Sequence, residues 1–328
     1  MSTSSKKAYI ATRVRNYLLA FAAILVVNFA IPRLMPGDPT TRFVGPGFTE
    51  EAQQELLREF GLTRPIWEQF GLYLVNTLTG DFGISFSRYP TPVMELVVDR
   101  LPRTLYLMGA SVTVSVLIGI PLGAFAAWNF SKREDLLLTQ VSLFFRSIPT
   151  FWLGILLAFV FGYVIPLFPI SGAVTAGVTH SGPIDYFLDL SYHTFLPVVT
   201  MAAYFLAGYT FLMRGSLLDI LPENYITIAE TKGLTDRQVL FNHAVPPAFP
   251  PVLTQLGFQI GRLAGGAVLV ETVFSYPGMG KLMFDAVLAR DYPTIQATFF
   301  FLAVMVLGAM FLAEILYTVI DPRIGGSE

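Results

Sequence analysis

The chain has 328 residues, of which 54% are hydrophobic and only 13% are charged. Soluble domains usually carry about 25% charged residues, so this chain has too few charges for a fully water-facing surface, and lipid must solvate part of it. The net charge of −2 gives no sign of nucleic-acid binding. The absence of cysteine excludes disulfides, Cys-based zinc sites and thiol nucleophiles, and the three histidines show no ligand spacing, so no metal site is expected.

Six segments along the chain are long and apolar enough to cross a bilayer, which requires about 20 residues per helix. The expected fold is therefore an all-α membrane protein with six transmembrane helices. The expected spans are 15–34, 104–130, 136–165, 196–213, 248–274 and 294–320. The first follows basic residues but lacks a small-x-small cleavage site, so we interpret it as an uncleaved transmembrane helix rather than a signal peptide.

The basic residues in the short loops predict the orientation. They favour the side that holds the N-terminus, which places both termini in the cytoplasm. The expected organisation is a cytoplasmic N-terminus with the first helix (1–35), an external insert (36–103), a core transmembrane domain (104–320) and a cytoplasmic tail (321–328). Within the core, the loop 214–247 is expected on the cytoplasmic side.

The external insert is predicted to contain two short helices. Thr49 is a good N-cap for the first, which Gly61 would end, and Pro65 begins the second, which continues to Leu78. Two interpretations remain open: the insert caps the outer end of the helix bundle, or it forms part of a docking surface for an external partner.

Glycines four residues apart predict close helix packing, because lipid supplies no hydrophobic drive for helix association. Such rows either pack helices within this chain or form a seam with a partner subunit. The glycines concerned are Gly119 and Gly123 in the second span, and Gly257, Gly261 and Gly265 in the fifth.

Polar side chains at membrane depth are candidates for a translocation pathway. Arg146 lies about ten residues into the third span, roughly 15 Å along a straight helix and therefore near mid-bilayer. It either lines the pathway or pairs with an acid or a carbonyl of a partner subunit. Gln259 and Arg262 in the fifth span are further candidates, and Arg262 could instead pair within the bundle.

The cytoplasmic loop 214–247 has the signals of a short helix that ends at a tight corner. Pro222 and Glu223 are typical of a helix start. Tyr225, Ile228 and Ala229 follow at helical spacing and would share one apolar face. Gly233 is expected to end this helix.

A second short helix is predicted directly after the corner. Thr235 and Gln238 form a capping box, and Leu234 and Val239 are placed for a hydrophobic staple. An exposed helix with an apolar face requires a groove in which to dock. The loop is therefore either a docking element for a partner protein or a cap that closes the bundle.

Residues 229–240, with His243 to Pro246 following, resemble the EAA loop of type I ATP-binding-cassette (ABC) importers, and in particular that of the dipeptide/oligopeptide permease family. Other matches keep the family's order along nearly the whole chain. These are Pro36–Pro39, Arg100–Leu105, Ile120–Gly123, Ser147–Gly154, Gly265–Phe274, Tyr276–Gly280, Ala289–Pro293 and Asp321–Arg323. One departure is Thr227, which stands where the EAA consensus has glutamate.

The resemblance implies a type I importer fold in a prokaryotic inner membrane. It also implies a second related permease, two ABC ATPase subunits that bind ATP and Mg²⁺, and an extracytoplasmic substrate-binding protein. This chain itself would hold no cofactor. The implied cargo is a peptide or a short oligosaccharide. The residues implied to contact the ATPase are Tyr225, Thr227, Ile228, Ala229, Glu230, Gly233, Leu234, His243 and Pro246.

Enzyme motifs give no support for chemistry on this chain. The nearest approach to a phosphate-binding loop, Ser275–Leu282, lacks the first glycine and the final Ser or Thr. The rival interpretation is a stand-alone channel or an ion-coupled transporter, which would usually place acids at mid-membrane. A membrane-embedded enzyme is a more distant alternative because no catalytic constellation is present.

Overall fold

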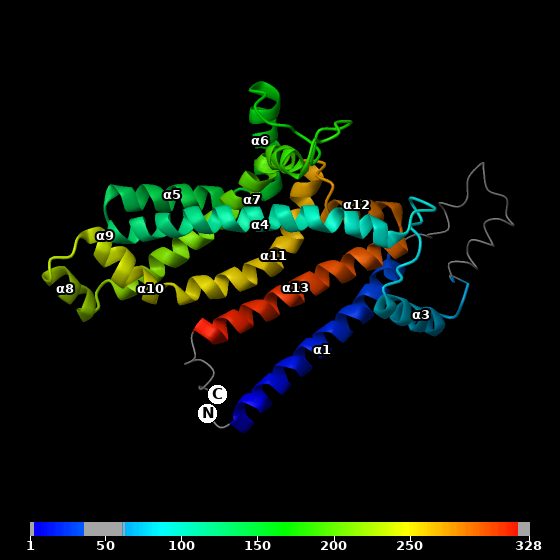
Figure 1. The fold of residues 1–328 in the computed structure, drawn as a ribbon, viewed down its shortest axis with the longest axis horizontal. Coiled ribbons are helices and arrows are strands. Elements are labelled where there is room, and N and C mark those ends of the chain that lie inside the picture. Colours follow the sequence, from blue (N-terminus) through cyan, green and yellow to red (C-terminus); the bar gives the residue numbers. More distant parts are fainter. Residues whose placement is uncertain (1–2, 36–60, 62, 321–328) are drawn as a thin grey trace. The chain divides into compact units, whose positions relative to one another are not determined.

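The computed structural model describes residues 3–35, 61 and 63–320; the side chains of 3–11, 257–258, 260–266 and 312–320 lie outside the description. The described chain is helical, with a single isolated antiparallel bridge between Ile84 and Pro92. Its elements are α1 (Thr3–Leu34), α3 (Ile66–Thr79), α4 (Val93–Trp128), α5 (Arg133–Ser147), α6 (Thr150–Ala158), the π-helix η2 (Phe159–Val164), α7 (Pro183–Ile220), α8 (Asn224–Thr231), α9 (Asp236–Gln238), the π-helix η3 (Val239–Ala244), α10 (Val245–Ala248), α11 (Pro250–Val273), α12 (Met279–Ala289) and α13 (Tyr292–Ile320) (Figure 1).

Four of the described helices are long and apolar enough to cross a membrane: Thr12–Leu34, Val93–Trp128, Pro183–Ile220 and Tyr292–Phe311. The bent pair Arg133–Ser147 and Thr150–Val164 makes a fifth if it counts as one span. The remaining expected span, 248–274, which is the fifth along the chain, largely coincides with α11, whose side chains are described only in part. A helical membrane protein is thus confirmed, while the number six and the first helix of the external insert stay predictions. Residues 36–60 lie outside the described residues.

The third expected span, 136–165, is wrong as a single helix, because the chain bends by 95° between α5 and α6. The residue before a proline is pushed out of the helical region, and Ile148, which precedes Pro149, is accordingly extended with φ −80° and ψ 128°. Helix α6 then begins at Thr150. Arg146 therefore lies in the last turn of α5, beside the bend, and its expected depth at mid-bilayer on a straight helix no longer follows.

Two further helix boundaries differ from the expectation. Helix α7 begins at Pro183, so residues 183–195, expected in a loop, are helical. Proline at the first helical position has the required φ and loses no hydrogen bond there. The same effect explains why α11 begins at Pro250 rather than at 248, where the fifth span was expected to begin.

The helices divide into two compact units, which are residues 1–102 with 278–307, and residues 103–277 with 308–328. In the first unit, α1 packs against α3 through a buried cluster of Leu25, Phe29 and Tyr73. Asn28 ties this cluster to α13, because its Nδ2 donates to the Tyr73 hydroxyl at 3.0 Å and to the Gln296 carbonyl at 2.8 Å. The second predicted helix of the insert is therefore present as α3, which packs on the C-terminal half of α1, while its external position stays a prediction.

A buried carboxylate joins the segment before α4 to the start of α13 within the same unit. Asp291 is fully buried and accepts hydrogen bonds from Ser85 Oγ at 2.5 Å, Ser87 Oγ at 2.7 Å and the Phe86 and Ser87 amides at 3.1 and 3.0 Å. A buried charge is costly unless it is hydrogen-bonded, and these four donors meet that requirement. Asp291 thus fixes the path of residues 85–87 rather than supplying chemistry.

In the second unit, α7 is the central helix, against which α5, α6, α10 and α11 pack. Buried polar groups also join α4 to α11: the Thr104 hydroxyl donates to Glu271 at 2.7 Å, and the Tyr276 hydroxyl donates to the Arg103 carbonyl at 3.1 Å. Burial raises the pKa of Tyr276 to about 12, so this hydroxyl stays a donor at any physiological pH.

Gly119 and Gly123 pack α4 directly against α7, which favours packing within the chain over a seam with a partner for this row. A Cβ on Gly119 would lie 2.8 Å from the Leu206 carbonyl oxygen and 2.9 Å from Tyr209 Cβ. The close approach lets the Thr210 hydroxyl of α7 donate to the Gly119 carbonyl at 3.2 Å. The side chains around Gly257, Gly261 and Gly265 lie outside the description, so their packing role stays a prediction.

We expect Gly119→Val to loosen the α4–α7 contact, because the added atoms meet backbone that cannot move aside. Overpacking of this kind costs about 1–3 kcal/mol. The measurement is thermal unfolding of the purified protein in detergent. Gly109→Val is the matched control, because a Cβ on Gly109 in the same helix meets nothing within 4 Å. Equal losses for both variants would contradict a specific contact.

Candidate functional site

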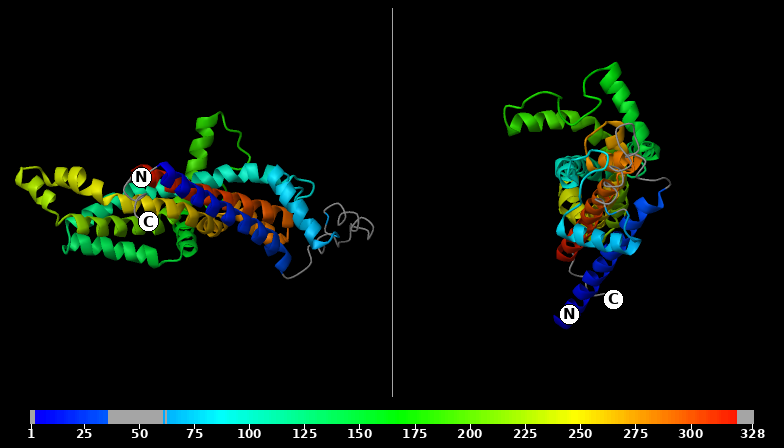
Figure 2. Two further views of the ribbon diagram at one scale, coloured as in Figure 1. Left: turned by 90° about the horizontal axis from the view of Figure 1, so that it is seen from below. Right: turned by 90° about the vertical axis from the view of Figure 1, so that its right-hand side faces the viewer.

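The segment from α8 to α10 forms a projection at one end of the second unit, beyond the α4–α5 turn (Figure 2). Helix α8 packs against η3, and α10 packs against α7. The buried side chains of this segment are Ile226, Ala229, Val239, Leu240, Ala244 and Ala248. The segment therefore has a small apolar core of its own that joins it to the membrane helix α7.

The outward face of α8 carries apolar side chains without cover in this chain. Tyr225 is 42% exposed and Ile228 is 53% exposed, and Phe241 on η3 is 46% exposed. Burial, with a smaller effect of Glu223, raises the pKa of Tyr225 above its usual value, so the ring stays neutral. This projection offers an uncharged aromatic and a branched aliphatic side chain to a partner.

The prediction of a single apolar face on α8 was partly wrong. Tyr225, Ile228 and Ala229 were expected together, but only Ala229 points inward, where Ile226 joins it. Ile226 and Ala229 are three residues apart, so they lie on one side of the helix. Helix α8 thus has one apolar side for η3 and a second for something outside the chain.

The corner after α8 agrees with the prediction. Gly233 has φ +79°, and its amide donates to the Glu230 carbonyl at 2.9 Å. The Thr235 amide then donates to Gln238 Oε1 at 2.9 Å, and the Gln238 amide donates to Thr235 Oγ1 at 3.4 Å, which completes the capping box. Two short helices therefore meet at a defined angle around one glycine.

The remaining residues of the expected contact set lie on the surface of the same projection. Thr227, Glu230, His243 and Pro246 are exposed, and Leu234 is half-buried. The structure therefore brings all nine predicted residues into one segment. Of these nine residues, Ala229 is the buried one. Phe241 was missed, although an apolar residue two positions after buried Val239 is the signal that could have identified it.

A bidentate ion pair fixes the membrane helices next to this projection. Arg214 of α7 donates from Nε to Asp135 Oδ1 at 2.6 Å and from Nη2 to Asp135 Oδ2 at 2.8 Å. The Asp135 side chain is 2% exposed and that of Arg214 is 23% exposed. The guanidinium also lies over the Phe130 ring, with 5.4 Å from Cζ to the ring centroid. Helices α5 and α7 are therefore joined close to the end of α7 that leads into α8.

The three pathway candidates are not shown to form one site. Arg146 is exposed, and its Nη1 lies 3.5 Å from the position that a Cβ on Gly208 of α7 would occupy. Gln259 is buried at 4% exposure, and the side chain of Arg262 lies outside the description. A pathway role for Arg146, Gln259 and Arg262 stays a prediction.

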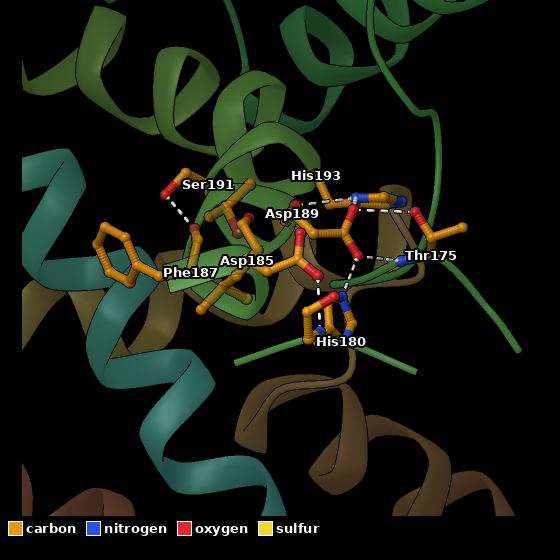
Figure 3. A network of polar contacts seen from close by, with 10 residues as sticks. Thr175, His180, Asp185, Phe187, Asp189, Ser191 and His193 are labelled. Carbon is orange, nitrogen blue, oxygen red and sulfur yellow. Dashed lines mark hydrogen bonds and ion pairs between the residues drawn. The ribbon is translucent and has the colours of Figure 1, made fainter. Parts of the chain in front are cut away.

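A second polar cluster ties the segment 165–182 to the first turns of α7 (Figure 3). Asp189 of α7 accepts from the Thr175 amide at 2.7 Å and from the Thr175 hydroxyl at 2.9 Å, and it lies 2.9 Å from His180 Nε2. His193 Nδ1 lies 3.0 Å from the same carboxylate. These histidines do not have the spacing of metal ligands, and within the part of the chain that the structure describes no group of acids and histidines is arranged to hold a metal ion.

A helical membrane protein with two short projecting helices, α8 and α9, that meet at a glycine corner is the class of protein that this fold and site define. Residues 119–326 match the family described as binding-protein-dependent transport system inner membrane component, and the chain belongs to this family.

Relatives are similar over almost the whole chain. The oligopeptide transport system permease protein AppB of Bacillus subtilis is 36% identical and is covered over 99% of its length by 97% of this chain. The dipeptide transport system permease protein DppB of Escherichia coli K12 is 34% identical, with 96% of this chain covering 98% of it. A solved inward-facing structure of the MetNI methionine ABC transporter shares the fold, with a TM-score of 0.57, 16% identity, and 70% of this chain covering 97% of that chain.

Proposed function

We propose that this chain is the permease subunit of an ABC importer for peptides, and that the segment 224–248 couples it to an ATPase. The observation that carries this proposal is the projection of α8 to α10, with Tyr225 and Ile228 exposed on one side of α8 and Ile226 and Ala229 buried on the other. A helix with an exposed apolar face of this kind suits insertion into a groove of a partner.

The coupling is mechanical in this proposal. Movement of the partner would displace α8, which transmits the displacement through η3 and α10 to α7 and α11, because these elements pack on one another. The Asp135–Arg214 pair joins α5 to α7, so these two helices would move together when α8 is displaced. The chain would perform no bond chemistry itself, and ATP and Mg²⁺ would be bound by the partners.

The proposed assembly contains this chain, a second related permease, two ABC ATPases and an extracytoplasmic substrate-binding protein. Both termini and the projection would lie in the cytoplasm, as the distribution of basic residues favours. Cargo follows from the relatives, which are described as oligopeptide and dipeptide permeases. A thermal-shift screen of the cognate binding protein with peptides of two to eight residues and with short oligosaccharides would test the cargo, and stabilisation by sugars alone would contradict it.

We expect Ile228→Glu to reduce the ATPase that co-purifies with the tagged chain by roughly tenfold, because an apolar anchor in a protein groove contributes about 2 kcal/mol. Val178→Glu is the matched control, since both side chains are 53% exposed and Val178 lies outside the projection. The measurement is quantitative immunoblotting of the pulled-down complex.

The outcomes separate the proposals. If the unchanged chain brings down no ATPase, the chain is not an ABC subunit, and a channel or ion-coupled transporter gains support. If Ile228→Glu retains the ATPase, or if Val178→Glu loses it equally, α8 is not the docking element.

A further inference from the structure

The first unit contains a cavity of about 380 Å³ next to the end of α1, between α3, the segment 80–86 and the start of α13. Its polar wall includes Arg33 of α1, Arg64 and Gln69 near and on α3, and Gln296 of α13. Leu72 and Phe82 contribute apolar wall. A concave site that combines a few convergent polar groups with apolar surface is typical of a binding pocket.

Arg33 is positioned in this cavity without a carboxylate partner among the described residues. Its guanidinium lies on the Phe29 ring, 3.6 Å from the centroid, and its Nε and Nη2 donate to Gln69 Oε1 at 3.2 and 2.9 Å. Nη1 donates to the Phe29 carbonyl at 2.9 Å. All of these acceptors are neutral, so no described residue that Arg33 contacts balances its positive charge, although the contacts orient the guanidinium.

A second donor on the cavity wall is also unsatisfied. Gln296 Nε2 is buried and has no acceptor in the structure. A buried donor without a partner is rare in native proteins and calls for an explanation. Asp81, the one described acid on this wall, accepts from the Gly83 amide and forms no ion pair with Arg33 or Arg64. The wall thus presents two cations and an unpaired amide, which call for anionic oxygens from a ligand.

The cavity lies beside the end of a helix that is long and apolar enough to cross a membrane, so we infer that it is near a membrane boundary. The apolar span of α1 ends at Leu34, one residue beyond Arg33. Helix α3 exposes Ile66, Trp67, Val75 and Leu78, with Trp67 72% exposed, and this pattern is typical of a helix that lies in the headgroup region. A ligand that arrives with an anionic head and an apolar tail fits a site with this polar wall beside such a helix.

We propose that this cavity binds the phosphodiester headgroup of an anionic phospholipid, with Arg33 as the principal contact and with Gln296 Nε2 as a second donor. The headgroup supplies the anionic oxygens that Arg33 and Gln296 lack. Its acyl chains follow the exposed apolar side of α3. The bound lipid stabilises the packing of α3 on α1 and α13.

The test uses the complete transporter, delipidated in detergent, with native mass spectrometry as the readout. Phosphatidylglycerol is added back, with phosphatidylcholine, inorganic phosphate and a neutral tripeptide as separate arms. Arg33→Gln is expected to weaken phosphatidylglycerol binding by roughly tenfold or more, since a hydrogen bond to a charged group is stronger than one between neutral groups. Arg88→Gln is the matched control, because Arg88 is an exposed arginine of the same unit that does not line the cavity.

Gln296→Glu is the second variant, in case Arg33→Gln impairs folding. It keeps the side-chain shape, removes the donor and places a negative charge on the wall, so it should also lose phosphatidylglycerol while the complex assembles. The proposal is supported if both variants lose phosphatidylglycerol and Arg88→Gln does not.

The proposal is overturned if Arg88→Gln loses as much phosphatidylglycerol binding as Arg33→Gln, or if Gln296→Glu binds phosphatidylglycerol normally. It is also overturned if binding of phosphate or of the tripeptide, rather than of the lipid, depends on Arg33. These outcomes do not depend on ATPase docking or on transport, so failure here leaves the proposed function intact.

Discussion

Replacing Gly233 by valine is expected to remove most peptide uptake while the ATPases remain attached. Gly233 has φ +79°, a conformation that a β-branched residue adopts only under strain. Such strain costs about 1–3 kcal/mol and is relieved when the corner between α8 and α9 opens. A coupling loss of that size corresponds to a roughly 5- to 150-fold change. The measurement is uptake of labelled peptide into vesicles, with ATPase content determined in the same membranes.

Two further variants make this test specific to the corner. Gly233→Asn should retain more uptake than valine, because asparagine tolerates positive φ better than other residues. Gly215→Val should behave nearly as the unchanged protein, since Gly215 lies within α7 and a Cβ there meets nothing within 4 Å. A Cβ on Gly233 also meets nothing within 4 Å, so any difference reports backbone strain rather than crowding. Normal uptake in Gly233→Val would contradict the coupling role of this corner.

Local signals in the sequence were sufficient to predict the corner at Gly233 and the ends of α3. Gly233 and the Thr235–Gln238 box depend on residues within a few positions of each other, so spacing alone predicts them. Pro65 likewise stands directly before Ile66, where α3 begins, and Gly80 ends that helix in the left-handed conformation. These features require no knowledge of what packs against the helix.

Features that depend on distant partners could not be predicted in this way. Tyr225 and Ile226 are neighbours that can each pack on an apolar surface, and the position of η3 decides that Ile226 is the buried one. A proline such as Pro149 can interrupt a helix, but the 95° angle of this bend depends on how α6 packs against α7 and α11. His193 lies one helical turn after Asp189 on α7, whereas His180 reaches the same carboxylate only because the segment 165–182 folds back on α7.

The Asp135–Arg214 pair is the clearest case of such a distant partnership, because 79 residues separate its members. Asp135 appears in sequence as a helix-start acid beside Glu134, and Arg214 as a basic residue at a membrane boundary. Both interpretations suit solvent-exposed charges. The structure instead buries the carboxylate, which also accepts from the Ser131 amide at 3.1 Å and the Thr139 hydroxyl at 3.3 Å.

Asp135→Asn is expected to destabilise the protein by about 3 kcal/mol, the lower end of the range for a broken buried pair, because the guanidinium of Arg214 loses its buried counter-charge but is itself only partly buried. In thermal unfolding of the detergent-solubilised complex, this corresponds to a fall in Tm on the order of 10 °C. The matched control is Asp285→Asn, which removes an exposed partner of Lys281 one helical turn away, with side-chain exposures of 26% and 40%. An exposed pair of this kind contributes at most about 1 kcal/mol.

The double variant Asp135→Leu with Arg214→Met distinguishes the effect of losing the ion pair from the effect of losing side-chain packing at the same place. Replacement of a buried ion pair by apolar side chains of similar volume is often neutral for stability, so the double variant should recover much of the Tm that Asp135→Asn loses. The hydroxyl of Thr139 would lose one acceptor, which limits full recovery. If the double variant is as unstable as Asp135→Asn, or if Asp285→Asn lowers Tm equally, the pair is not what joins α5 to α7, and the transmission of movement from α8 into the bundle must follow another contact.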